Sequence, residues 1–182
     1  MSILPTLRYA LLLAAAGVGV ASCISPPDYP ETPEIEFKTL KQQFINNARG
    51  TRDSLVINVS YKDGDGDLGL NPEEEIPNSP QNLRNYTYFC ILQIRNANNE
   101  FVDDPFTTSL PGLSGRFKRL APAEQGDKKA PIEGNIEYGL ALYRLQVPSL
   151  QPGATMRFRI KIQDRALQQS NEVFTNSFVL TR

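Results

Sequence analysis

Alternation of apolar and polar side chains constrains this chain most, because a period of two residues fits a β-strand and not an α-helix. The clearest case covers residues 156–163, where Met156, Phe158, Ile160 and Ile162 alternate with polar residues. Such a segment has one buried and one solvated face, as is common in antiparallel sheets. The sequence therefore predicts a β-strand here.

Similar segments follow one another from residue 34 to the end of the chain. Residues 55–61 alternate in the same way, and residues 86–95 carry apolar side chains on both faces, which predicts a central strand. Further strands are expected at 101–102, 115–120, 132–143 and 173–180. Only residues 39–47 are ambiguous between helix and strand. About seven short strands without a βαβ pattern predict an all-β fold, an antiparallel β-sandwich forming a single domain over residues 34–182.

The first 22 residues have the composition of a targeting segment. Arg8 precedes an apolar stretch from Tyr9 to Ala21. As a helix this stretch would rise about 20 Å, which is short of a hydrocarbon core of about 30 Å. Residues 1–22 therefore predict a cleavable signal peptide and not a membrane span.

The residues that end this segment, Val20-Ala21-Ser22-Cys23, resemble the lipobox of bacterial lipoproteins. The resemblance implies cleavage before Cys23 and lipidation of its thiol, with palmitate-type acyl chains that hold the protein on a membrane. The alternative is an ordinary secretory signal that ends near a cysteine. With Cys23 lipidated, Cys90 is the one remaining thiol, and no intramolecular disulfide is expected.

Residues 23–33 contain four prolines after the cysteine and predict an extended tether between membrane and domain. This start is similar to that of lipoproteins of the Bacteroidota, in which acidic residues after the cysteine direct export to the cell surface. Here the acidic residues are spaced apart, and Ile24 stands where enteric bacteria use aspartate to retain lipoproteins in the inner membrane. The resemblance implies a lipid-anchored protein of the outer membrane, on either its periplasmic face or the cell surface.

A second resemblance concerns the end of the chain. The segment Leu150-Gln151-Pro152-Gly153-Ala154-Thr155-Met156 and the alternating residues after it resemble the approach to strand F of fibronectin type III and related immunoglobulin-like domains. The later segment 164–171 would then be the loop between strands F and G. This resemblance implies an immunoglobulin-like β-sandwich.

The sharpest local motif is Asp63-Gly64-Asp65-Gly66-Asp67-Leu68-Gly69, directly after a predicted strand. Carboxylates at alternating positions repel one another unless a cation neutralises them, and the intervening glycines let the backbone curl. The spacing matches the first ligand positions of an EF-hand loop, although Leu68 occupies the glycine position and the flanks predict strands. We expect a calcium loop at one end of the sandwich, with these candidate ligands: Asp63, Asp65, Asp67, Glu74 and Asp164. The alternative is that Asp and Gly are simply favoured in turns.

Composition argues against catalysis and against nucleic-acid binding. The chain has no histidine, which excludes Ser/His/Asp and Cys/His mechanisms and histidine-ligated metals. Its candidate catalytic carboxylates, Asp63, Asp65, Asp67 and Glu73 to Glu75, cluster in one loop, and it has no tryptophan for a carbohydrate-active cleft. The formal net charge is -1, so no nucleic-acid partner is expected. We therefore expect a protein that is not an enzyme.

Two non-catalytic functions remain open: a binding or adhesion module for a protein or glycan partner, and a structural accessory subunit of an outer-membrane protein complex. A basic face could serve an anionic glycan, but the alternation also predicts an ordinary solvated sheet face. Its residues would be Arg157, Arg159 and Lys161, joined by Arg116, Lys118 and Arg119.

Overall fold

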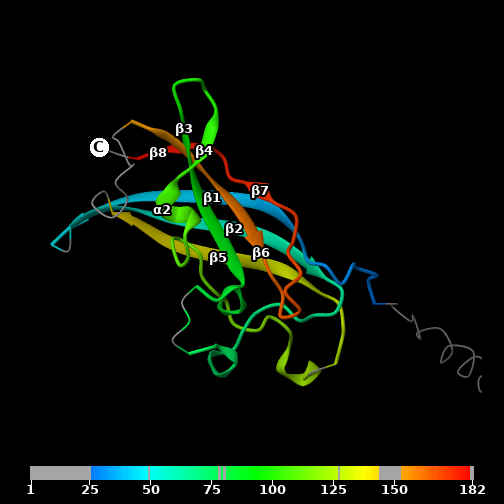
Figure 1. Cartoon of the computed structure of the whole chain (residues 1–182). Helices are drawn as coiled ribbons and strands as arrows, with labels where there is room; N and C mark the ends of the chain where they lie inside the picture. The colour runs from blue at the N-terminus through cyan, green and yellow to red at the C-terminus, as the bar shows by residue number, and fades with distance from the viewer. Residues whose placement is uncertain are drawn as a thin grey trace, which may run out of the picture.

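The computed structural model describes residues 26–48, 50–77, 79, 81–126, 128–143 and 153–180. Within these ranges two antiparallel sheets with eight strands form a β-sandwich (Figure 1). The prediction of an all-β sandwich from the alternation is thus confirmed. No helix in these ranges is long and apolar enough to cross a membrane.

The smaller sheet has the order β1-β2-β5, with β1 at Glu34–Asn47, β2 at Gly50–Asp63 and β5 at Ile132–Tyr143. Strand β2 is central and pairs with β5 as far as its last residue, Asp63, which lies opposite Ile132. The ambiguous residues 39–47 belong to β1, an edge strand whose side chains are mostly exposed. An exposed edge needs no apolar alternation, which explains the ambiguity.

The larger sheet has the order β4-β3-β6-β7, with β8 also paired to β6. Its strands are β3 (Tyr88–Arg95), β4 (Phe101–Asp103), β6 (Thr155–Ile162), β7 (Val173–Phe174) and β8 (Phe178–Val179). The expected last strand is divided in two because Thr175 takes the place of a ladder residue. Its hydroxyl accepts a hydrogen bond from the Phe158 N–H, while its own N–H donates to the Phe158 carbonyl.

The strand expected at 115–120 is the one that the structure does not contain. Only Gly115 forms a bridge, opposite Tyr88. The segment beyond it follows the loop after β2: the Leu70 N–H donates to the Phe117 carbonyl, and the Leu120 N–H donates to the Leu68 carbonyl. These residues are extended, but their partner is a loop and not a sheet.

The strand order is compatible with an immunoglobulin-like sandwich. In such folds strands A, B and E form one sheet and strands C, F and G the other. Here β1, β2 and β5 form one sheet, while β3, β6 and β7 lie in the other. In such a sandwich β6, between β3 and β7, would correspond to strand F.

The core lies between the two inner faces of the sandwich. Tyr88 stacks on Tyr138 with ring centroids 4.2 Å apart, and Phe158 stacks on Phe178 at 5.2 Å. Cys90 is fully buried, and this burial raises the pKa of its thiol. The cysteine therefore packs as a small apolar residue and not as a nucleophile.

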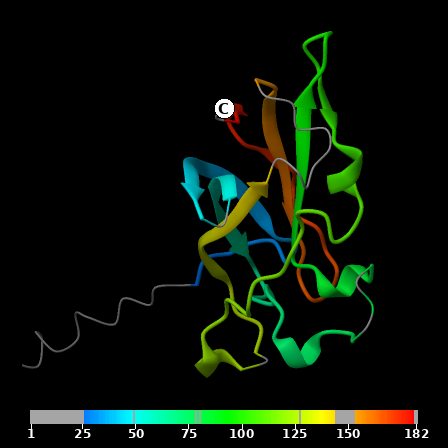
Figure 2. The same ribbon diagram turned by 90° about the vertical axis from the view of Figure 1, so that its left-hand side faces the viewer.

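Long loops gather at one end of the sandwich, opposite the β3–β4 hairpin (Figure 2). They carry three short helices, η1 (Pro72–Glu74), η2 (Leu83–Asn85) and η3 (Ala123–Gln125). A fourth, α2 (Pro105–Thr108), follows β4 and lies beside β3. At this end Asp63 is the last residue of β2, and the loop that follows contains Asp65 and Asp67 of the Asp-Gly motif.

Candidate metal centre

The loop after β2 brings three carboxylates together. One carboxylate oxygen from each of Asp63, Asp65 and Asp67 lies within 4.8 Å of the other two. Asp63 is fixed by the sheet, and its Oδ2 accepts a hydrogen bond of 3.0 Å from the Asp67 N–H, which curls the loop back on itself. The curl places alternating side chains on the same side of the loop.

The glycines between these aspartates allow two other segments to approach the loop closely. A Cβ on Gly64 would lie 2.2 Å from the carbonyl oxygen of Tyr29, and a Cβ on Gly66 would lie 2.3 Å from that of Ala130. Gly66 also has a φ of +71°, a conformation that favours glycine. Glycine is therefore required at both positions.

Asp164 joins this cluster from the loop after β6. Its backbone forms an antiparallel bridge with Leu68, and its charge contributes to raising the pKa of Asp63. Asp63, Asp65 and Asp164 are buried, with 0%, 6% and 2% of their surface exposed, and Asp67 is half-buried. Asp164 thus lies beside the three grouped aspartates at this end of the sandwich, and its role as a ligand stays a prediction.

Each of the four carboxylates gives one oxygen to a protein donor. The Asp67 Oδ2 accepts from the Ala166 N–H at 3.2 Å, and the Asp164 Oδ1 accepts from the Gln168 N–H at 2.7 Å. The Asp65 Oδ2 lies 3.2 Å from the Lys129 Nζ. Together with the Asp63–Asp67 bond, these contacts hold all four side chains in place.

The second oxygen of every carboxylate is buried and has no hydrogen-bond partner among the described residues. These oxygens are Asp63 Oδ1, Asp65 Oδ1, Asp67 Oδ1 and Asp164 Oδ2. Buried polar atoms without a partner are uncommon, because each has lost its hydrogen bonds to water without a replacement, and this loss costs free energy. Asp63, Asp65 and Asp67 thus form a group of oxygen donors that could hold a metal ion.

Burial and mutual repulsion disfavour the ionised form of this cluster. Burial, followed by the charges of Asp65, Asp67 and Asp164, raises the pKa of Asp63 to about 7. Burial likewise raises the pKa of Asp164 to about 6, with smaller contributions from Asp67 and Asp65. The cluster therefore holds negative charge at neutral pH only against a substantial penalty, which a divalent cation would remove.

Glu74, the fifth candidate ligand, has other partners. Its carboxylate forms an ion pair with Arg119, which lowers the pKa of Glu74, and it accepts a hydrogen bond of 2.7 Å from the Asn71 N–H. The chain turns at Pro72 into η1 instead of continuing an EF-hand loop. We therefore leave Glu74 out of the ligand set proposed below, and its role as a ligand stays a prediction.

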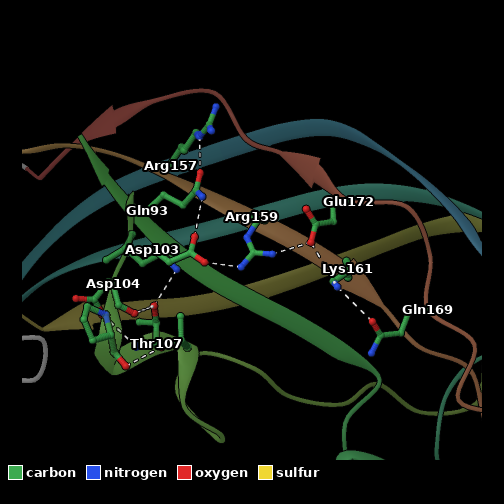
Figure 3. Close-up of polar contacts among 12 residues, drawn as sticks. Gln93, Asp103, Asp104, Thr107, Arg157, Arg159, Lys161, Gln169 and Glu172 are labelled. Atoms are coloured by element: carbon green, nitrogen blue, oxygen red, sulfur yellow. Dashed lines mark hydrogen bonds and ion pairs between the residues drawn. The ribbon is translucent and has the colours of Figure 1, made fainter. Parts of the chain in front are cut away.

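The basic residues of β6 form a linear network with acidic and amide side chains (Figure 3). The Arg159 guanidinium lies 2.5 Å from Asp103 and 2.6 Å from Glu172, and Glu172 also pairs with Lys161. Arg157 donates to Gln93. This pairing favours the interpretation of an ordinary polar sheet face.

The other basic residues of the proposed face are also engaged or dispersed. Arg157 lies between two aromatic rings, 4.2 Å from the centroids of both Phe101 and Phe174. Arg116 pairs with Glu75, and Lys118 is exposed. The six residues therefore do not form one unpaired anion-binding surface.

Two parts of the chain that contact the acidic cluster were not predicted from the sequence. One is Lys129, and the other is the segment 29–33, which we call the strap because it lies across the Asp-Gly loop. The one local indication of the strap was Gly64, whose missing side chain makes room for it. Cys23, the predicted lipidation site, lies outside the described residues.

Comparisons with known proteins give no relative for this chain. No family model matches it, and neither a curated protein nor a solved structure matches it. The functional argument therefore depends on the residues of this chain alone.

Proposed function

We propose that this chain is a lipid-anchored protein of the outer membrane or cell surface, a non-catalytic binding or adhesion module with calcium stiffening one end. The observation that carries the calcium part is the set of four buried carboxylates, each with one unpartnered oxygen. The Cys23 motif and the segment before it support the anchor.

The donor set favours calcium over other metals. All four side chains offer hard oxygen donors, the chain has no histidine, and its buried Cys90 lies in the core. Soft and borderline metals such as copper and zinc prefer nitrogen and sulfur ligands. Magnesium requires a near-ideal octahedron and usually retains several waters, whereas calcium accepts irregular sets of six to eight oxygens. Carboxylates from two loops fit the latter preference.

A binding role for the molecule is supported by the way in which the acidic cluster joins the loops at one end of the sandwich. The four carboxylates join the loop after β2 to the loop after β6, and Lys129 adds the loop before β5. A cation there would hold three loops of the sandwich in one arrangement. Loops that are positioned by a rigid sandwich commonly carry binding surfaces.

The alternative, an accessory subunit of an outer-membrane complex, is favoured by a hollow on the outer face of the larger sheet. It has a volume of about 340 Å³, and its apolar residues Phe89, Ile91, Leu83 and Leu110 are joined by polar side chains that include Arg159 and Lys161. Leu83 is 52% exposed. Photo-crosslinking from Leu83 in intact cells to an integral membrane protein, with the exposed Asn135 of β5 as the control position, would favour this alternative.

Thermal unfolding in detergent tests the calcium site. The full chain should melt at a higher temperature in millimolar calcium than in chelator, because a ligand that binds the folded state stabilises it. The double substitution Asp65→Ala and Asp67→Ala should abolish the difference, while Glu137→Ala, which removes an exposed carboxylate from β5, should preserve it. Equal melting temperatures of the unsubstituted chain in both buffers would refute the calcium site.

A further inference from the structure

The strap contacts the acidic loop directly. The Gly64 N–H donates a hydrogen bond of 2.8 Å to the Pro30 carbonyl, and Gly64 stands between two of the clustered aspartates. The Lys129 Nζ bridges the two segments, at 3.0 Å from Glu31 Oε1 and 3.2 Å from Asp65 Oδ2. The strap and the acidic loop are thus joined by a backbone hydrogen bond and by the ammonium group of Lys129.

A second contact ties the strap to the loop that carries Asp164. The Thr32 hydroxyl donates a hydrogen bond of 2.8 Å to the side chain of Gln168. The backbone N–H of Gln168 in turn donates to the Asp164 carboxylate at 2.7 Å. Gln168 therefore contacts both the strap and the Asp164 carboxylate. Gly64, which donates a hydrogen bond to the strap, lies next to Asp63 and Asp65 in the sequence.

The outer end of the strap is held by the β2–β5 pair. The Tyr29 hydroxyl donates to Glu133 at 2.8 Å, and the Lys62 ammonium lies 5.3 Å from the centre of the Tyr29 ring. These contacts are exposed and individually weak, because water competes for each of them. Docking of the strap consequently depends on the loops beneath it keeping their shape.

We infer that a cation bound by the four aspartates fixes the strap against the domain and so sets the length of free chain between the domain and Cys23. This inference rests on the proposed cation site and lipid anchor. Without a cation, the like charges push the Asp-Gly loop and the Asp164 loop apart, and the groups that receive Pro30 and Thr32 move with them. With a cation, both loops are held, and the strap keeps its partners.

The change in reach follows from chain geometry. With the strap docked, six residue steps separate Cys23 from the first docked residue, Tyr29, and a chain of that length spans at most about 20 Å. With the strap released, eleven residue steps separate Cys23 from Glu34, and a chain of that length spans at most about 40 Å. Cation binding would therefore roughly halve the distance by which the domain can stand off its anchor.

Thermodynamic linkage makes the coupling reciprocal. If the cation favours strap docking, the docked strap must raise the affinity for the cation by the same factor. Displacing the strap should then weaken calcium binding although no carboxylate has changed. Couplings of this kind are commonly roughly 5- to 150-fold.

Hydrogen exchange of the full chain in detergent, with calcium or with chelator, tests the inference. Calcium should slow exchange at Gly64, whose N–H donates to the Pro30 carbonyl of the strap, while amides in β3 and β6 should change little. Gly64→Ala should displace the strap, since its Cβ would meet the Tyr29 carbonyl, and should weaken calcium binding. Gly139→Ala is the matched control, because its Cβ would have no atom within 4 Å.

A second variant removes two of the strap contacts without touching the acidic loop. Tyr29→Ala combined with Thr32→Ala deletes two exposed side-chain bonds, and it should lower calcium affinity as Gly64→Ala does. Calcium binding that leaves exchange at Gly64 unchanged would overturn the coupling and leave the proposed calcium site intact. Failure of the unsubstituted chain to bind calcium at all would overturn both.

Discussion

Leu68 and Asp164 form an isolated antiparallel bridge that joins the loop after β2 to the loop after β6. Leu68 is fully buried, so the core holds this junction in place. The bridge puts the Asp164 carboxylate among the three aspartates of the Asp-Gly motif, and the first prediction follows from this placement.

Substitution Asp164→Asn removes one of the four repelling charges and keeps an oxygen that can accept from the Gln168 N–H. In chelator, the variant should be at least as stable as the unsubstituted chain, because less like charge is buried. Its calcium affinity should fall about tenfold or more, since ligand charge tunes calcium binding. Calcium titrations followed by thermal unfolding measure both effects, and Glu137→Gln serves as the control. An unchanged calcium affinity would remove Asp164 from the ligand set.

Stability in the absence of calcium should fall as the pH rises. The pKa of Asp63 is raised from 3.8 to about 7 in the folded protein. Between these two values the folded state holds a proton that the unfolded state has lost, so the free energy of unfolding decreases as pH increases. Melting temperatures in calcium-free buffer should therefore decline from pH 5 to pH 8.

Calcium should largely cancel this decline, because the ion stabilises the ionised carboxylates and competes with the proton. The calcium-induced rise in melting temperature should accordingly be larger at pH 8 than at pH 5. Asp63→Asn should flatten the calcium-free profile. A profile of the unsubstituted chain that rises with pH would contradict the account of a strained acidic cluster.

Anchoring is tested in cells by Cys23→Ala. Without a thiol to lipidate, the protein should move from the membrane to the soluble fraction, because single weak contacts do not replace two or three acyl chains. Cys90→Ala is the control for loss of a thiol, and it should remain with the membrane. Persistence of Cys23→Ala in the membrane fraction would show that another tether exists.

The strands that could be predicted from sequence are those with one buried face. Met156, Phe158, Ile160 and Ile162 alternate in sequence and are all fully buried in β6. Residues 39–47 of edge strand β1 stayed ambiguous between helix and strand because few side chains of β1 enter the core. The segment 115–120 was misjudged because an extended loop that pairs with another loop has the same local pattern as a strand.

The site was predictable where its residues share a local motif. Asp63, Asp65 and Asp67 meet because the glycines between them permit a tight curl. Glu74 was assigned on EF-hand spacing, yet it pairs with Arg119, a partner that no local pattern indicates. Lys129 and the strap reach the cluster through contacts between distant segments, which depend on the assembled fold and not on spacing.

Isothermal titration of the purified full chain with calcium tests the central claim most directly. The account predicts saturable binding of one ion per chain, lost when Asp65 and Asp67 are both replaced by alanine and preserved in Glu137→Ala. The absence of saturable binding at millimolar calcium, or binding that survives the double substitution, would contradict it.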